Sequence, residues 1–200
     1  LKSISRRHTA RQAIEAVGII QDNGISNVSI DLIYGLPTQD VERWAEDLTT
    51  AFSLEIKHLS SYALSIEPGT PLYQRKLWGE IEETPEEVFI EMYEMLRQSA
   101  EQAGFEQYEI SNFSKVGYES RHNINYWKCG EYIGIGPSAH SFFDGKRFYY
   151  SRNMEDFIDN KTYFDCYGGD KEEFIMLSLR LKSGLNFKEY NYIIYLLKLY

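Results

Sequence analysis

The chain has 200 residues, of which 43% are hydrophobic and 26% charged, and its formal net charge is −9. This composition is typical of a folded globular domain and excludes a mainly disordered chain. The negative charge repels nucleic-acid phosphates, and no run of Lys or Arg offsets it, so we expect no nucleic-acid partner. No apolar run approaches the roughly 18 residues of a membrane-spanning helix, and the first residues do not form a signal peptide.

The two cysteines, Cys129 and Cys166, stand too far apart in the sequence for a clustered metal motif. We therefore expect no metal site within this chain. So few cysteines, with no supported disulfide, favour a reducing compartment and predict a cytoplasmic protein. The chain begins at Leu1 and not at Met, so we expect the natural protein to extend further toward its N-terminus.

The first third of the chain alternates between helical and strand patterns. Apolar residues recur at helical spacing over residues 6–23, and a nearly continuous apolar run over 27–34 predicts a strand covered on both faces. A second helix is predicted over 41–53 and a second strand over 58–65. This strand–helix–strand order predicts a parallel pair with a right-handed crossover, as in an α/β barrel or a doubly wound sheet.

The pattern changes in the rest of the chain. Thr84-Pro85-Glu86-Glu87 predicts a helix start with a capping box, and a strand is expected over 105–110. The aromatic, Gly-rich stretch that follows predicts short strands and functional loops up to residue 151. From Met154 onward we expect mainly helices, one over 172–181 and another capped by Asn186 and Glu189. The predicted segments are 1–83, 84–151 and 152–200.

Asp31 is the first candidate site residue, because it stands in the middle of an apolar strand. Alternation along the strand places Ser29, Asp31 and Ile33 on one face, away from the face that suits helix packing. A carboxylate pointing into a barrel costs several kcal/mol unless a cation or hydrogen-bond donors meet it. Asp31 is therefore interpreted either as a structural acid paired with a nearby Arg or as an acceptor for a ligand ammonium or hydroxyl group.

A second candidate is the block His122-Asn123-Ile124-Asn125-Tyr126-Trp127, which joins an imidazole, amides and two large rings. A porphyrin needs aromatic walls and a nitrogen ligand for its iron. By spacing alone the block is also compatible with a His that caps a turn beside core aromatics. Two other motifs, Gly134-Ile135-Gly136 and Glu67-Pro68-Gly69, predict a close backbone approach and a rigid turn.

Several of these segments, in this order, resemble the oxygen-independent coproporphyrinogen III oxidase family of radical S-adenosylmethionine proteins. The resemblance covers residues 1–150 well and the remainder loosely, and the His-Asn-x-x-Tyr-Trp block is closest to the haem chaperone branch, often called HemW. The matching residues are Arg6-Arg7-His8, Ile30-Asp31-Leu32-Ile33-Tyr34-Gly35-Leu36-Pro37, His58-Leu59-Ser60-Ser61-Tyr62, Glu67-Pro68-Gly69-Thr70, His122-Asn123, Tyr126-Trp127, Gly134-Ile135-Gly136 and Ala139-His140-Ser141.

The resemblance implies the C-terminal part of an incomplete (βα) barrel, followed by a mixed α+β region. It implies S-adenosylmethionine and a [4Fe-4S] cluster as cofactors, with Asp31 and Arg6 holding S-adenosylmethionine. For haem or a porphyrin it implies four residues as binding candidates: His122, Asn123, Tyr126 and Trp127. It leaves open a haem-acceptor protein and a peripheral membrane contact, and it assigns no catalytic residue.

One departure from the family is large, because the Cys-x-x-x-Cys-x-x-Cys motif that ligates the cluster is absent from this sequence. We therefore expect the chain alone to be inactive in radical chemistry. Three interpretations remain: a haem-binding chaperone, an anaerobic coproporphyrinogen III oxidase that performs oxidative decarboxylation, and a plain α/β domain whose matches are structural.

Overall fold

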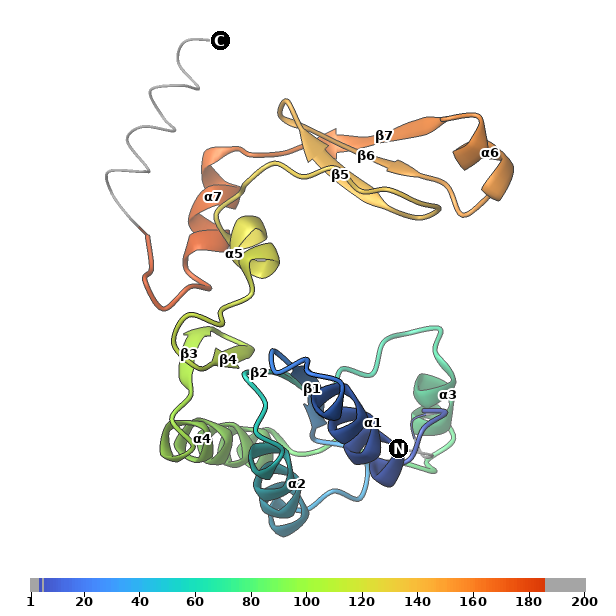
Figure 1. Cartoon of the computed structure of the whole chain (residues 1–200). Coiled ribbons are helices and arrows are strands. Elements are labelled where there is room, and N and C mark those ends of the chain that lie inside the picture. Colours follow the sequence, from blue (N-terminus) through green and yellow to red (C-terminus); the bar gives the residue numbers. More distant parts are fainter. Residues whose placement is uncertain (1–3, 5, 186–200) are drawn as a thin grey trace. The chain divides into compact units, whose positions relative to one another are not determined.

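The computed structural model describes residue 4 and residues 6–185, and it divides the chain into two compact units, 1–119 and 120–200 (Figure 1). The division differs from the boundaries at 83 and 151 that the sequence predicted. Residues 84–119 belong with the first unit because one of their strands pairs directly with a strand of the predicted parallel pair. The helix capped by Asn186 and Glu189 lies outside the described residues.

The predicted elements of the first unit are present with small changes at their ends, and the structure adds a helix over Pro71–Leu77 that was not predicted. Its helices are α1 (Ala10–Asp22), α2 (Val41–Ser53), α3 (Pro71–Leu77) and α4 (Glu86–Gln102), and its strands are β1 (Ser29–Tyr34), β2 (His58–Ala63), β3 (Glu106–Glu109) and β4 (Asn112–Ser114).

Side-chain caps explain where most of these helices begin. Thr9 and Gln12 form a reciprocal capping box at α1, and the Asp40 carboxylate accepts the amide of Arg43 at α2. The capping box predicted at Thr84 is wrong. Pro85 occupies the N-cap of α4 without a side-chain hydrogen bond, and the Thr84 hydroxyl instead donates to the carbonyl of Gly35 at 3.1 Å. Thr84 therefore ties the start of α4 to the end of β1.

The sheet of the first unit has the strand order β1-β2-β4-β3. β1 and β2 are parallel, as predicted, with Asp31 opposite Ser60. β4 runs antiparallel to β2, and β3 runs antiparallel to β4 with a bulge between Gln107 and Glu109. The unit is thus a mixed α/β arrangement in which a parallel pair continues into an antiparallel hairpin.

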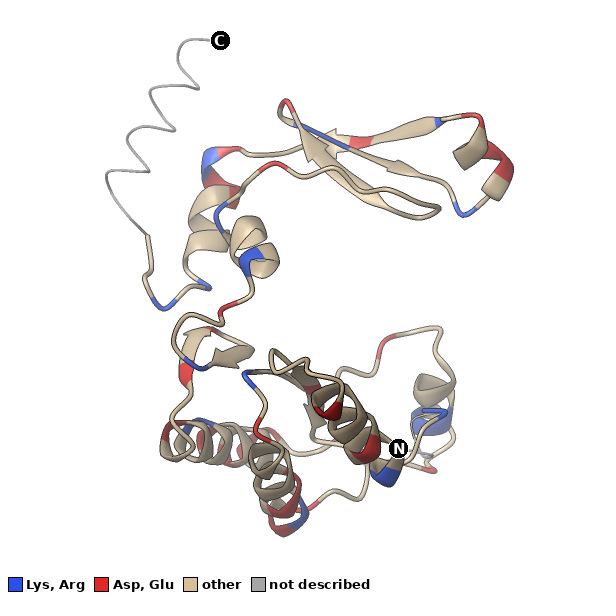
Figure 2. Cartoon of the chain, in the orientation of Figure 1, with Lys and Arg blue, Asp and Glu red and all other residues tan. Residues whose placement is uncertain are grey.

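One face of this sheet packs against helices. The buried core joins residues of α1, α2 and α4 to the strands, and it includes Val17, Val28, Tyr34, Trp44, Leu48, Leu59, Met92, Leu96 and Phe113. The Trp44 indole N–H donates to the carbonyl of Met92 at 2.9 Å, which links α2 to α4 inside the core. The Asp and Glu residues of α2 and α4, whose positions are red in Figure 2, are exposed.

The second unit contains a three-stranded antiparallel sheet and short helices. Its elements are α5 (Arg121–Trp127), β5 (His140–Phe143), β6 (Lys146–Tyr150), α6 (Met154–Ile158), β7 (Thr162–Tyr167) and α7 (Lys171–Ser178), with strand order β5-β6-β7.

Two expectations for the second unit are corrected. The His122 block forms a helix, α5, because Ser120 caps its start by accepting the amide of Asn123. Residues 154–185, the described part of the region expected to be helical, are not mainly helical, because residues 162–167 are rich in β-formers and pair with β6 as β7. The close backbone approach predicted at Gly134 is confirmed, since an added Cβ there would lie 2.2 Å from the carbonyl oxygen of His140.

Among the described helices, none combines the length and the apolar character that a membrane span requires.

Candidate functional site

The face of the first sheet opposite the helices is polar. Pairing in register brings Ser29 and Asp31 of β1 to the same face as His58 and Ser60 of β2, and as Asn112 and Ser114 of β4. We call this set, together with Tyr108 and Glu109, the polar sheet face. Ser29 and Asp31 are exposed, whereas His58, Ser60, Glu109, Asn112 and Ser114 are buried.

His58 lies at the centre of the polar sheet face and bridges two hydroxyl groups. Its Nδ1 lies 2.7 Å from Ser29 Oγ, and its Nε2 lies 2.8 Å from the phenol oxygen of Tyr108. Each hydroxyl can donate or accept, so the bridge is satisfied with either tautomer of the ring. Burial lowers the pKa of His58 below its ordinary value, and the charges of Asp31 and Glu109 oppose part of that effect.

A buried carboxylate lies beside the bridge. Glu109 is 1% exposed, and its carboxylate accepts hydrogen bonds from the Ser111 amide and the Asn112 side-chain amide. The side-chain oxygens of Asn112 and Ser114 are buried without a hydrogen-bond partner in the part of the chain that the structure describes. The face therefore keeps unused hydrogen-bonding capacity next to His58.

The two residues predicted to hold S-adenosylmethionine are both exposed. Asp31 lies in β1 on the polar sheet face, which is the strand face that the sequence predicted. No ion pair joins Asp31 to an Arg among the described residues, so the structural-acid interpretation finds no support there. Arg6 precedes α1.

A hollow lies at the C-terminal ends of β1 and β2. It has a volume of about 280 Å³, and its lining includes Gly35, Pro37, Ala63, Ser65 and Phe89. The C-terminal ends of parallel strands are where α/β folds place their ligands. This hollow adjoins the strand that carries Asp31.

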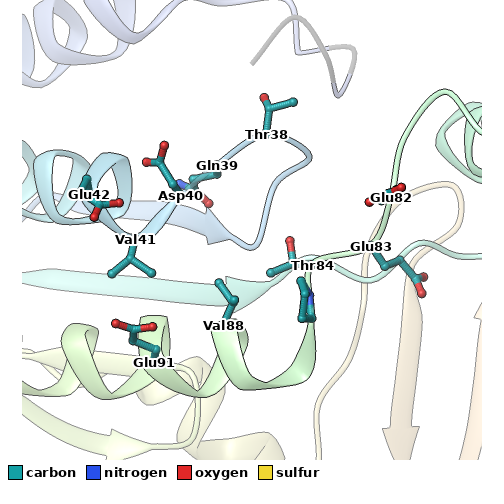
Figure 3. Close-up of a pocket in the computed structure, with 11 residues that line it drawn as sticks. Thr38, Gln39, Asp40, Val41, Glu42, Glu82, Glu83, Thr84, Val88 and Glu91 are labelled. Carbon is teal, nitrogen blue, oxygen red and sulfur yellow. The ribbon is translucent and has the colours of Figure 1, made fainter.

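A second hollow of about 450 Å³ lies between the starts of α2 and α4 (Figure 3). Asp40, Glu42, Glu82, Glu83 and Glu91 surround it, so its wall is strongly acidic. Glu83 is paired with Lys76 at 2.8 Å. Exposed carboxylates of this kind form an ordinary solvated surface, and we assign no ligand to this hollow.

In the second unit, α5 brings the other predicted residues together in pairs. His122 is exposed, and its ring lies edge-on to Tyr126 with centroids 4.6 Å apart. Tyr126 makes a similar contact with Tyr132 at 4.6 Å, and Tyr132 continues to Phe142. Asn123 and Trp127 are half-buried one turn apart on the same helix. An exposed imidazole therefore stands at the end of a row of aromatic rings.

The row of rings borders a cavity of about 250 Å³ inside the second unit. Trp127, Cys129 and the ion pair of Arg147 with Glu173 complete its lining. Burial raises the pKa of the Cys129 thiol, and the charge of Glu173 adds to that effect, so the thiol stays protonated near neutral pH. Both cysteines are free.

The sequence did not predict that His58 would bridge Ser29 and Tyr108. The signal was present in the strand register, because His58 begins the second predicted strand and alternates in phase with Ser60. Tyr108 and Glu109 gave no such signal, since a bulge turns them toward the polar sheet face. In the described part of the chain, no group of three or more His, Cys, Asp or Glu side chains is placed to hold a metal ion.

Curated relatives of this chain include haem chaperones and a radical S-adenosyl methionine domain-containing protein. The chain is 34% identical over 199 residues to the heme chaperone HemW of Bacillus subtilis, covering 95% of this chain and 52% of that protein. It is 40% identical over 143 residues to the mitochondrial radical S-adenosyl methionine domain-containing protein 1 of Bos taurus, covering 72% of this chain and 32% of that protein. No protein-family model matches the chain.

A solved structure shares the fold. The radical SAM enzyme coproporphyrinogen III oxidase (HemN) of Escherichia coli aligns with a TM-score of 0.73 and 15% identity, covering 96% of this chain and 49% of that one. The chain thus spans between about a third and a half of the length of the proteins it matches. By sequence the chain is homologous to HemW-type haem chaperones, and its fold is similar to that of the coproporphyrinogen III oxidase HemN.

Proposed function

We propose that this chain is the C-terminal part of a radical S-adenosylmethionine protein that binds haem and acts as a haem chaperone. In this proposal β1 and β2 are strands of an incomplete (βα) barrel, and the polar sheet face lines its interior. The parallel pairing of β1 with β2 and the exposure of Asp31 on the face opposite the helices support that arrangement.

S-adenosylmethionine is the cofactor proposed for the polar sheet face. The Asp31 carboxylate is free to accept hydrogen bonds from an ammonium or ribose hydroxyl group, and the planar guanidinium of Arg6 suits the methionyl carboxylate. When bound, the cofactor and a [4Fe-4S] cluster supply one-electron chemistry. The chain has two cysteines, so the three thiolates of the cluster must come from residues outside it.

Haem is the ligand proposed for the second unit, and the exposed imidazole of His122 beside Tyr126 is the observation that carries this assignment. Imidazole is a common axial ligand of haem iron, and neighbouring aromatic rings offer apolar surface to the macrocycle. Asn123, Tyr126 and Trp127 would complete the binding surface. The names of the relatives, heme chaperone HemW, support the same ligand. A haem-acceptor protein and a cytoplasmic location are part of the proposal.

The test is a titration of the purified chain with hemin, followed by absorption spectroscopy. We expect a shifted Soret band in the wild type, and we expect His122→Ala to abolish that shift. His8→Ala is the matched control because His8 is also exposed but lies in the first unit. An unchanged Soret shift in His122→Ala would remove this residue from the site.

Anaerobic coproporphyrinogen III oxidase is the second candidate, and the fold shared with the Escherichia coli enzyme favours it. The two candidate functions differ in whether the protein converts coproporphyrinogen III to a product. A longer form of the protein that includes a cluster motif, reconstituted with iron and sulfide, should bind hemin without decarboxylating coproporphyrinogen III if the chaperone proposal holds. Formation of protoporphyrinogen IX would favour the oxidase.

A further inference from the structure

Trp127 lines the cavity beside α5, and its indole N–H has no acceptor among the described residues. The Nε1 atom of this indole is buried. A buried N–H without an acceptor costs roughly 1–3 kcal/mol. The Arg180 guanidinium lies 4.2 Å above the indole ring, so the ring is held in place while its N–H is unused.

A cation stands on the wall of the same cavity. Glu173 binds two nitrogens of the Arg147 guanidinium, at 2.8 and 3.1 Å, and the guanidinium also lies 4.5 Å from the centroid of the Phe142 ring. Glu173 accepts the Gly169 amide as well, at 2.7 Å. Burial disfavours the charge on Arg147, but the hydrogen bond and charge of Glu173 outweigh this and raise its pKa. Arg147 and Glu173 thus neutralise each other, and the guanidinium is held in one orientation.

The size and lining of the cavity restrict what it can hold. Its volume of about 250 Å³ is below the roughly 300–1,000 Å³ of a site that encloses a whole drug-sized ligand. Tyr126, Tyr132 and Phe142 give it aromatic walls. It therefore suits one edge of a flat apolar ligand, provided that the edge carries an acceptor for Trp127 and Arg147.

We propose that this cavity binds a propionate-bearing edge of the porphyrin, with the carboxylate accepting from Trp127 Nε1 and facing Arg147. This inference rests on the proposed haem function and adds to it a contact separate from iron ligation. The ring of His122 contacts Tyr126, which is also part of the cavity wall, so an imidazole ligand and a carboxylate site lie at two ends of one aromatic row.

The test compares two ligands, hemin and hemin dimethyl ester, in the wild type and in Trp127→Phe. The substitution removes one N–H and keeps an aromatic ring. Because that N–H has no partner in the protein, we expect the thermal midpoint of the ligand-free variant to stay within a degree or two of the wild type. We expect hemin affinity to fall about tenfold, the value of one hydrogen bond to a charged group. The position of the Soret band should not change, because His122 still ligates the haem iron.

The ester lacks the carboxylates, so both proteins should bind it with equal and weaker affinity. Trp78→Phe, at an indole that is 70% exposed in the first unit, is the control and should change nothing. Equal hemin affinity in the wild type and Trp127→Phe would overturn the inference, as would a large loss of thermal stability in the ligand-free variant. If the wild type shows no Soret shift, the proposed function fails and this inference with it. If His122→Ala abolishes the Soret shift but Trp127→Phe binds hemin as tightly as the wild type, only the carboxylate site fails.

Discussion

Gly35 lies against the ring of Phe89 so closely that an added Cβ would stand 2.0 Å from Phe89 Cε1. Gly35 follows β1 directly and has a φ of 73°, in the left-handed region where residues with a Cβ are disfavoured. Its carbonyl also accepts the hydroxyl of Thr84. A glycine here lets α4 pack against the end of β1, beside the hollow that the two parallel strands form.

Gly35→Ala should therefore destabilise the first unit through both backbone strain and overpacking. We expect the free energy of unfolding to fall by about 2–4 kcal/mol, the sum of a left-handed residue with a Cβ and a crowded core. Chemical denaturation followed by tryptophan fluorescence measures this free energy of unfolding. Gly69→Ala is the matched control, because Gly69 has a φ of 81° and nothing within 4 Å of an added Cβ. If both variants lose the same stability, contact with Phe89 contributes nothing.

The His58 bridge predicts a pH dependence of stability. Its folded-state pKa is lowered by burial, so folding favours the neutral ring. At a pH above about 6.5, the ordinary pKa of histidine, both the folded and the unfolded states hold this ring neutral. As the pH falls below that value, the unfolded state binds a proton more readily, and stability is lost until the pH passes the folded pKa. The free energy of unfolding should therefore decline between pH 7.5 and 5.

Replacing the His58 ring isolates its contribution to the pH dependence of stability. His58→Gln should lower stability at pH 7.5, because one side chain must replace two hydrogen bonds, but its decline toward pH 5 should be shallower than in the wild type. His8→Gln serves as the control, since His8 is exposed and should leave the profile of the wild type unchanged. Parallel profiles for wild type and His58→Gln would show that other groups set the pH dependence.

Trp44→Phe is expected to be costly, in contrast to the substitution proposed at Trp127. The Trp44 indole is 1% exposed and donates to Met92 between α2 and α4. Losing this bond and part of the ring volume should cost about 2 kcal/mol of unfolding free energy. Thermal denaturation of Trp44→Phe and Trp127→Phe compares an indole N–H that donates a hydrogen bond with one that has no acceptor among the described residues. A Trp44→Phe variant as stable as the wild type would contradict this role.

Local patterns predicted the first unit well. The range of α2 matches its prediction, and β1 and β2 are parallel as the strand–helix–strand order required, because short connections leave few alternatives. The face of β1 that carries Asp31 also followed from alternation. These features depend on residues that are neighbours in sequence, where helical and strand periodicities are informative.

The remaining features depend on contacts between distant segments. Thr84 looked like a cap but binds Gly35, 49 residues away in the sequence. His58 gained its role from Tyr108, which a bulge 50 residues later turns toward it. In the second unit, β7 became a strand because β6 offers an edge to pair with, and propensity alone did not distinguish it from a helix. Neither the bridge nor the cavity at Trp127 could be inferred from spacing.

The exposed carboxylate of Asp31 gives the last prediction, which concerns S-adenosylmethionine. The cluster thiolates are not part of this chain, so only side chains such as Asp31 and Arg6 would contact the ligand. We therefore expect weak binding at best, with a Kd on the order of 1 mM or above, since a few exposed polar contacts supply little net free energy. Isothermal titration calorimetry of the wild type and Asp31→Asn measures this, and the variant should bind more weakly still. Glu42→Gln, which removes an exposed carboxylate of α2 away from the strand, is the control. Micromolar binding without a cluster, or an Asp31→Asn variant that binds as well as the wild type, would mean that this acid does not hold the ligand.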